Sequence, residues 1–262
     1  MTPEGGRREL NRTWFVIAWL SVVTLATGCT TVMAGTARPV PNIKPRPLSG
    51  DTVKQVLLDA AALSKILHQR FEEKPEWPSA FGGAEQLQAV GEVTAPDCVG
   101  ATTMTEPRPY QSANVQKVAR QHWWAIVTAS AKVLKVSEAV VALPTAAEAT
   151  ALFGKFSAQW DKCQGQTVTT APGHVVFSDK ISDVHVADSV LAGTLLHEIR
   201  VSGFPPSPNH VARAIGVRVN CLVELYVDFF ELPNSPDEGG DNVGTTAIDL
   251  AHVMMDKVST LS

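Results

Sequence analysis

Valine-rich segments with stretches of alternating apolar and polar residues occupy much of the second half of the chain, and they constrain its fold most strongly. Such alternation places apolar side chains on one face of a strand and polar ones on the other, which is typical of a half-buried antiparallel sheet. We therefore expect a sheet built mainly from this half. The segments with strand character are 139–143, 166–170, 174–177, 182–191, 195–202 and 211–229.

Apolar residues at helical spacing flank these segments. One predicted helix has Ser49 or Asp51 as its cap and extends to about Leu67. A second begins after Thr145 with a capping box, and a third follows Thr245. Strands that cluster after helices without regular alternation favour an α+β fold over a parallel doubly wound sheet. We predict a single domain with an antiparallel sheet flanked by helices and a cleft.

An uncharged stretch opens after Arg12 and contains Cys29. Three arginines lie in the first twelve residues, and the apolar run 14–25 has the length of a secretory signal. Residues 26–29 have the small-residue pattern of a lipoprotein cleavage and acylation box. We predict that residues 1–28 are a signal peptide and that Cys29 carries a diacylglyceryl thioether. Its two acyl chains would anchor the protein to the outer face of the cytoplasmic membrane.

Two alternatives to acylation stay open. The uncharged run up to Arg38 is long enough to remain as an uncleaved anchor, and an ordinary signal peptide would leave Cys29 incidental. All three interpretations send the rest of the chain outside, because arginines before an apolar segment stay in the cytoplasm. Residues 29–50 would then form the acylated N-terminus and a proline-rich linker, and residues 51–262 the folded domain.

The composition argues against nucleic-acid binding. The formal net charge is −4, and removing residues 1–28 takes away three arginines but only two glutamates, so the acidic excess grows. A nucleic-acid binder usually carries the opposite charge. The hydrophobic fraction of 45% is sufficient to build a proper core.

No complete catalytic or metal-binding motif occurs in the sequence. His197 and Glu198 begin like the zinc motif H-E-x-x-H, but Val201 occupies the position of the second histidine. No G-x-S-x-G nucleophile elbow is present either. We predict no catalytic residue, no metal and no cofactor, and we interpret His197 as a sheet residue with a satisfied hydrogen bond.

Three cysteines remain if Cys29 is acylated, namely Cys98, Cys163 and Cys221. The compartment is oxidising, so we expect a structural disulfide, and the sequence leaves all three pairings open. Cys221 lies in a valine-rich strand pattern, which is typical of a buried free thiol. An intermolecular bridge through Cys221 is the alternative.

A few polar and aromatic residues are candidates for ligand contact. Arg218 and Asn220 share parity along a predicted strand, so a cation and an amide would line a cleft and bind a polar or anionic ligand. If residues 122–124 form a strand, Trp123 and Trp124 point to opposite faces. We include Trp124 as the third candidate.

Several short segments carry a resemblance to a known family. In order and spacing, residues 47–259 resemble the PknH-like extracellular sensor domain, which is found on actinobacterial receptor kinases and, without a kinase, in mycobacterial-type lipoproteins. The resemblance implies an antiparallel sheet flanked by helices, a cleft for a ligand and no established catalysis. The segments that carry it are 48–50 with 56–58, 97–100, 139–141 before Pro144, 159–160 with Cys163 and Gly165, and 217–220.

The resemblance also implies one disulfide pairing. Domains of this family commonly hold two disulfides, and Cys98 with Cys163 would match the first. Cys221 would match the last cysteine of the second, but its expected partner shortly after Cys163 is missing, because residues 171–174 contain no cysteine. The resemblance therefore implies a bond between Cys98 and Cys163 and leaves Cys221 unpaired.

Together these features predict a non-catalytic lipoprotein that is anchored to the membrane and binds a ligand or partner outside the cell. We expect a small-molecule or cell-wall ligand, and an envelope or signalling protein as a further partner. A lipid or glycolipid carrier or structural envelope protein is the alternative function, and an uncharacterised hydrolase is the third.

Overall fold

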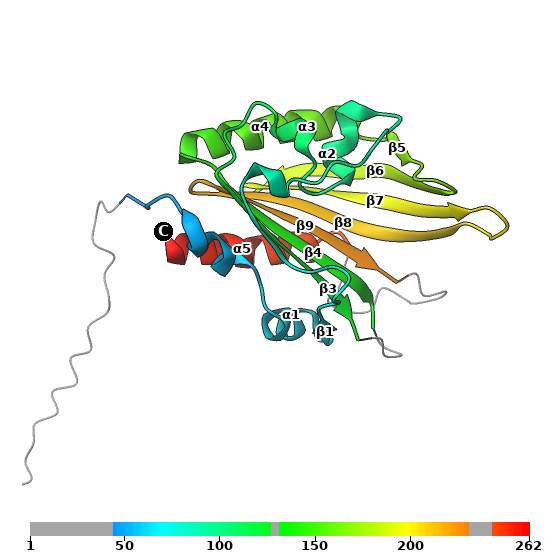
Figure 1. Ribbon diagram of the computed structural model, residues 1–262, viewed down its shortest axis with the longest axis horizontal. Helices are drawn as coiled ribbons and strands as arrows, with labels where there is room; N and C mark the ends of the chain where they lie inside the picture. The colour runs from blue at the N-terminus through cyan, green and yellow to red at the C-terminus, as the bar shows by residue number, and fades with distance from the viewer. Residues whose placement is uncertain (1–43, 127–130, 231–242) are drawn as a thin grey trace, which may run out of the picture. The chain divides into compact units, whose positions relative to one another are not determined.

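The computed structural model describes residues 44–126, 131–230 and 243–262. Within them, one antiparallel sheet has the strand order β1-β3-β4-β9-β8-β7-β6-β5, and β2 also pairs with β3 (Figure 1). The long central strands are β3 (Lys117–Ala125), β4 (Val133–Ala142), β9 (Cys221–Phe229), β8 (Ser207–Arg218), β7 (Val190–Val201) and β6 (Val175–Ala187). The short strands at the edges are β1 (Phe71–Glu72), β2 (Ala80–Gly82) and β5 (Thr167–Thr170).

Helices cover both faces of this sheet (Figure 1). One face carries α4 (Ala146–Cys163) together with the short helices η3 (Pro96–Cys98), α2 (Val99–Thr102) and α3 (Pro107–Tyr110). The other face carries α5 (Thr246–Leu261), η1 (Gly50–Val56) and α1 (Ala60–Leu67), and η2 (Ala84–Gln86) follows β2. The predicted α+β class, with an antiparallel sheet flanked by helices, is therefore confirmed.

Strand parity divides the apolar residues into two cores. On the α5 face, the buried stripe of Leu250, Met254 and Val258 packs against inward-facing residues of the central strands such as Val223 and Leu225. Each fully buried aliphatic side chain of this kind stabilises the fold by about 1.5–3 kcal/mol. The sheet is thus buried on both faces over its middle, which explains the high valine content of its strands.

Helix α4 forms the second core on the opposite face. Its first turn is capped by Thr145, whose side-chain oxygen accepts a hydrogen bond from the Glu148 backbone at 3.2 Å, as the sequence predicts. Leu152, Phe156 and Trp160 then form the buried stripe of α4 against the sheet. The predicted cap and packing face of this helix are confirmed.

The prediction of one continuous first helix is wrong, because the structure has two separate helices there. Residues 50–56 form the 3₁₀ helix η1, and the α-helix starts only at Ala60. Asp59, rather than Ser49 or Asp51, supplies the cap, since its carboxylate accepts a hydrogen bond from the Ala62 backbone at 2.7 Å. The chain is extended at the break because the buried Glu138 carboxylate binds the Leu58 backbone N–H at 2.9 Å.

The predicted strand boundaries also need correction. Strand β6 continues through the predicted gap at 178–181, and the long predicted segment 211–229 is a hairpin of β8 and β9. The turn between β6 and β7, which falls inside the predicted strand 182–191, and the turn between β8 and β9 both lack glycine. Residues Asp188 and Ser189 adopt φ values of 48° and 66°, and Val219 adopts 50°. Positive φ is rare for a β-branched residue such as Val219, so residue type gave no turn signal there.

Candidate functional site

One end of the α4 face of the sheet carries partly buried ionisable and aromatic side chains instead of a helix-packed core. Strand register places them side by side: Trp124 pairs with Lys135, Lys135 with Asp228, and Asp179 with His197. We call this set the polar strip. Its members are His122 and Trp124 on β3, Lys135 and Ser137 on β4, Tyr226 and Asp228 on β9, Asn209 on β8, His197 on β7, and Phe177 and Asp179 on β6.

The β3 end of the polar strip is basic and aromatic. Two ammonium groups lie over the Trp124 ring, with Lys74 Nζ 4.5 Å and Lys135 Nζ 5.3 Å from its centroid. Lys135 Nζ is also 5.2 Å from the centroid of the Tyr226 ring. Such distances fall in the range of cation–π attraction, which is strongest at desolvated sites. The ammonium groups here are thus held by ring faces.

His122 is the second ring at this end. Its Nδ1 forms a hydrogen bond of 2.8 Å with Ser137 Oγ, and the ring of Trp77 approaches it edge-on at 6.3 Å between centroids. Trp77 and Lys74 both come from the connection between β1 and β2, which brings them to β3 because both short strands pair with it. This connection therefore forms one side of the polar strip.

The β6 end of the polar strip contains an acid–histidine pair. Asp179 Oδ1 lies 2.6 Å from His197 Nδ1, and the Phe177 ring stacks on the imidazole at 5.9 Å. Asn209 Nδ2 donates a hydrogen bond to Asp228 Oδ1. Among the residues that the structure describes, no hydroxyl or thiol forms a hydrogen bond with His197, so the pair has no nucleophile beside it. His197 has the satisfied hydrogen bond that the sequence predicts.

Burial shifts the pKa of several groups in the polar strip. Burial, with the Lys135 and Arg120 charges next, lowers the pKa of His122 to about 4. Burial also lowers the pKa of Lys135 and raises that of Asp228, and the two opposite charges partly offset these effects. The pKa of Tyr226 is raised mainly by burial and then by Asp179 and Asp228. Clusters of desolvated, pKa-shifted groups are typical of functional sites.

A buried ion pair adjoins the polar strip. Arg213 donates to Glu224 Oε2 at 3.2 Å, and both side chains are 1% exposed. Glu224 Oε1 also accepts hydrogen bonds from the Tyr110 hydroxyl at 2.5 Å and the Thr105 backbone at 3.1 Å. Burial, with Glu224 beside it, raises the pKa of Tyr110. The remaining guanidinium hydrogen bonds go to the carbonyl oxygens of Gly100, Ala101 and Leu225.

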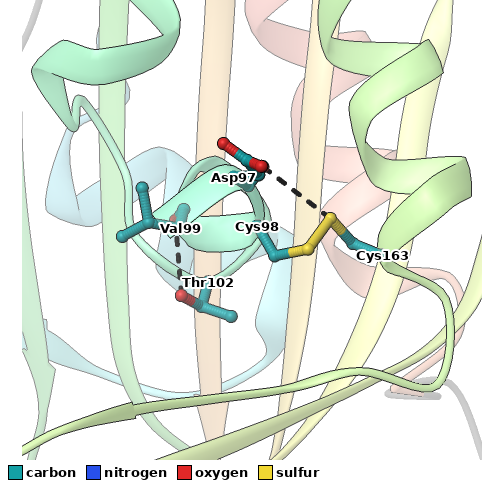
Figure 2. The surroundings of a disulfide bond; sticks show 5 residues. All are labelled: Asp97, Cys98, Val99, Thr102 and Cys163. Carbon is teal, nitrogen blue, oxygen red and sulfur yellow. Dashed lines mark hydrogen bonds between the residues drawn. A yellow bond between two sulfur atoms is a disulfide. The ribbon is translucent and has the colours of Figure 1, made fainter. Parts of the chain in front are cut away.

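A disulfide lies next to helix α2, whose Gly100 and Ala101 carbonyls accept hydrogen bonds from Arg213 (Figure 2). Cys98 at the end of η3 is bonded to Cys163 at the end of α4, with Cα atoms 5.6 Å apart. The Cys163 sulfur lies 3.8 Å from the Asp97 carbonyl oxygen, and Thr102 donates to the Val99 carbonyl within α2. The pairing implied by the family resemblance is therefore present, and α2 is attached to α4 by the disulfide and to the sheet by Arg213.

The three predicted ligand contacts do not lie together. Trp124 belongs to the polar strip. Arg218 is the last residue of β8, where it pairs with Cys221, and its side chain is exposed. Asn220 lies in the turn after β8, so the premise that it shares a strand with Arg218 is wrong. The turn went unrecognised because neither of its central residues is a glycine.

The side chain of Asn220 forms hydrogen bonds with the backbone instead. Its Oδ1 accepts the Leu48 N–H at 2.7 Å, and its Nδ2 donates to the carbonyls of Leu48 and Leu143 at 3.0 and 2.6 Å. The side chain is 1% exposed. These contacts tie the beginning of the domain to the β8–β9 turn, and they leave the Asn220 amide unavailable to a ligand.

The other predicted residues have simple placements. Cys29 and the rest of the predicted signal segment lie outside the described residues. Cys221 is free and fully buried, and burial raises the pKa of its thiol to about 12, so a bridge to another chain would require unfolding. Among residues 44–126, 131–230 and 243–262, no cluster of three or more His, Cys, Asp or Glu side chains is placed to hold a metal.

A separate pocket lies on the α5 side of the sheet. It has a volume of about 400 Å³, within the range of small-ligand sites. Strand parity places Ala192, Thr194 and His210 on this face, opposite the polar strip. Asp183, His185, Gly193, Val243 and Gly244 complete its lining.

Most residues of the polar strip escaped the sequence analysis. Strip residues come from six strands that are distant in the chain, so no local motif contains them. A signal does exist in strand parity. Polar residues alternate with buried apolar ones at His122 and Trp124 around Trp123, and at Tyr226 and Asp228 around Val227. A sheet face that bears such partly buried polar residues points to binding rather than to packing.

The sheet, its two helix layers and the disulfide define an α+β domain. The sequence profile of the PknH-like extracellular domain matches residues 48–257, so the chain belongs to this family. No curated protein matches the chain.

Two solved structures are similar to this domain. The crystal structure of the extracellular domain of PknH from Mycobacterium tuberculosis is 19% identical, with a TM-score of 0.65 over 83% of this chain and 100% of that one. An uncharacterised protein from Mycobacterium smegmatis is 11% identical, with a TM-score of 0.37 over 80% of this chain and 96% of that one. The first similarity shows a shared fold.

Proposed function

We propose that this protein is an exported lipoprotein whose domain binds a ligand through the polar strip without chemical turnover. The observation that supports this most is a pair of unsatisfied hydrogen-bond donors, which lower the stability of the protein without a ligand. The Nε1 atom of Trp124 and the Nε atom of Arg120, two residues before His122 on β3, are buried without a hydrogen-bond partner. An unsatisfied buried donor costs about 1–3 kcal/mol, so we expect a ligand to accept these hydrogen bonds.

Binding fits the strip better than hydrolysis does. The pair of Asp179 and His197 resembles the acid and base of a triad, but the described residues place no nucleophile against His197. A lipid carrier would need an extended apolar cavity. The pocket on the α5 side has Asp183, His185 and His210 among its lining residues, so it gives that alternative no particular support.

The anchor belongs to the same proposal. Residues 1–28 would be the signal peptide, residues 29–50 the acylated linker and residues 51–262 the sensor domain. Among the described residues, the helices are too short or too polar to cross a bilayer. A lipid on Cys29 would hold the domain beside the membrane, where an envelope or signalling protein would receive its signal.

Replacement of Cys29 by alanine should abolish lipid attachment. The thioether needs this sulfur, so radiolabelled palmitate should enter the wild-type protein and be absent from C29A. The matched control is C221A, which leaves the lipid site intact and should retain full labelling. A wild-type protein without label, or a C29A protein with it, would exclude the lipoprotein assignment.

Replacement of Trp124 by alanine should release a ligand that copurifies with the wild-type protein. Loss of a buried aromatic contact at the centre of a binding site commonly costs 2 kcal/mol or more, about thirtyfold in affinity. Native mass spectrometry of protein purified from membranes should show bound mass on the wild type and none on W124A.

The control for this experiment is F204A, which removes an aromatic ring that is 73% exposed and lies in the loop between β7 and β8. It should keep the bound mass. Retention of the ligand by a folded W124A variant would show that the polar strip is not the binding site.

A further inference from the structure

Three cations, Lys74, Arg120 and Lys135, lie on the Trp124 side of the polar strip. Among the described residues, no carboxylate lies within 4.0 Å of Lys74, Arg120 or Lys135. Lys74 and Lys135 are instead positioned over the faces of aromatic rings. A ring face holds an ammonium group without neutralising it, so the positive charge remains available.

Strand parity and ring contacts place these cations on the same face of the sheet. Arg120, His122 and Trp124 alternate along β3 and therefore face the same side of the sheet. Lys135 reaches this region from β4, where it pairs with Trp124, and Lys74 reaches it from the β1–β2 connection. The Nζ atoms of Lys74 and Lys135 lie 4.5 and 5.3 Å from the centroid of the Trp124 ring. After burial, the charges of Lys135 and Arg120 contribute to the lowered pKa of His122.

Two hydrogen-bond donors on this face of β3 are also unsatisfied. Arg120 Nε and Trp124 Nε1 are buried donors without acceptors. Cations with free N–H groups and little bulk water around them are the usual means by which proteins bind carboxylates and phosphates. Burial strengthens such contacts, because the local dielectric constant is low.

Within the described part of the chain, the nearby acidic groups form no ion pair with these cations. Asp228 is a buried acid that pairs with Lys135 across the ladder, but its Oδ1 accepts a hydrogen bond from Asn209 and burial raises its pKa. Glu72 pairs with Trp124 across the ladder and faces the same side, but it is exposed to solvent. Among the described residues, the acids of the β1–β2 segment, Glu72, Glu73 and Glu76, are exposed to solvent, and the buried Asp228 carboxylate is hydrogen-bonded to Asn209.

We propose that the polar strip binds its ligand through an anionic group, a phosphate or a carboxylate, held by Arg120, Lys135 and Lys74 beside the Trp124 ring. This inference rests on the proposed function and specifies its ligand. The anion accepts the free N–H groups of Arg120 and Trp124. The rest of the ligand lies toward Tyr226 and the acid–histidine pair.

The test uses His122 as an internal reporter. An anion beside Arg120 and Lys135 offsets the two charges that disfavour the imidazolium, so binding raises the pKa of His122 from about 4. A rise of one pKa unit corresponds to tenfold tighter binding by the imidazolium form. Affinity for the anion should therefore increase as the pH falls through the pKa of His122 in the complex.

Histidine side-chain NMR titrations would use the soluble domain with sn-glycerol 3-phosphate or D-glucuronate, and with glycerol or glucose as neutral counterparts. The anions should raise the pKa of His122 by one unit or more, and the neutral compounds should leave it unchanged. Asp228, Glu72 and Tyr226 are titratable groups that face the same side of the sheet, so overall affinity depends on several protonation steps. The His122 resonance is followed because it reports one group alone.

Charge-removing variants sharpen the test. K135M and R120M should each weaken anion binding at least tenfold, whereas K65M, at an exposed position of α1, should bind like the wild type. In the free protein, K135M should also raise the pKa of His122, because one neighbouring cation is gone. Unfolding would return the pKa of His122 to its ordinary value near 6.5, so a smaller rise, together with an unchanged circular dichroism spectrum, shows that the variant is folded.

Binding to phosphatidylglycerol vesicles, with phosphatidylcholine vesicles as control, distinguishes a lipid headgroup from a soluble anion as the ligand. Binding to free anions assigns a soluble ligand, and binding only to phosphatidylglycerol vesicles assigns a lipid headgroup. The inference is overturned if neither anion nor vesicle alters His122, or if K135M binds as well as the wild type. Should W124A still release the copurified ligand in that case, the strip remains the binding site and its ligand is neutral.

Discussion

Replacement of Arg213 by methionine should lower the free energy of unfolding by about 3–5 kcal/mol, the usual effect of removing one member of a buried ion pair. Glu224 would then stay buried with its charge uncompensated, and the carbonyls of Gly100, Ala101 and Leu225 would lose their donor. Domains of this kind are stable by only about 5–15 kcal/mol, so the loss is a large fraction of the total. Chemical denaturation of the soluble domain would measure it.

The matched control is R218M, on the same strand but exposed to solvent. It should change stability by no more than about 0.5 kcal/mol. If R213M does not fold, Y110F gives a milder test, because it deletes a single hydrogen bond to a charged acceptor at a cost of about 1.5–3 kcal/mol. An R213M domain within 1 kcal/mol of the wild type would show that the ion pair contributes little.

The double variant R213M/E224M should recover part of the loss. Two apolar side chains of similar volume leave no buried charge, and such replacements are often neutral or stabilising. The two single losses should therefore sum to more than the double loss, as for other residues that share one network. Additive losses would mean that the two side chains act independently.

Replacement of both Cys98 and Cys163 by alanine should cost about 4 kcal/mol, the loop-entropy value for a bond between residues 65 positions apart. The bond attaches α2 to α4, so amide hydrogen exchange should quicken most in η3 and α2. Arg213 should still hold α2 to the sheet, and we expect a loosened segment in a folded domain. Thermal unfolding and hydrogen exchange would measure both effects.

A reducing agent supplies the control for this variant. It should lower the melting temperature of the wild-type domain to about that of C98A/C163A, and it should leave the variant unchanged. The free Cys221 is buried and contributes no bond to reduce. An unchanged melting temperature of the reduced wild type, or a peptide map with Cys221 in the bond, would contradict the assigned pairing.

Local interactions explain which parts of the fold were predictable. Helix α4 was predicted from a cap and an apolar stripe, both of which lie within its own sequence. The break before α1 depends on Glu138, which lies 80 residues from Leu58 in sequence. The hairpin turn at Val219 depends on Asn220, whose amide binds the chain near Leu48. Long-range contacts override local preference at both points.

The site shows the same limit more strongly. Trp124 was identified because two adjacent tryptophans on a strand must face opposite ways. Its neighbours Lys135 and Asp228 come from other strands, and only the sheet register brings them together. Alternation along each strand predicts that Lys135 and Asp228 lie on the polar face of their own strand. It does not predict that these polar faces belong to the same side of the sheet as Trp124.

The fold gives the polar strip both its floor and its neighbouring support. Central strands buried on both faces keep the floor rigid, while Arg213 and the disulfide fix α2 beside it. A preformed site loses less entropy when its ligand binds. Stability elsewhere in the domain therefore offsets the desolvation of the ionisable groups in the strip.

A crystal structure of the protein purified from membranes with its copurified ligand would test the binding site most directly. We predict electron density for a bound molecule in contact with the Trp124 ring and with an acceptor near Lys135. Density in the pocket lined by Thr194 and His185, with the polar strip occupied by water alone, would contradict the assignment.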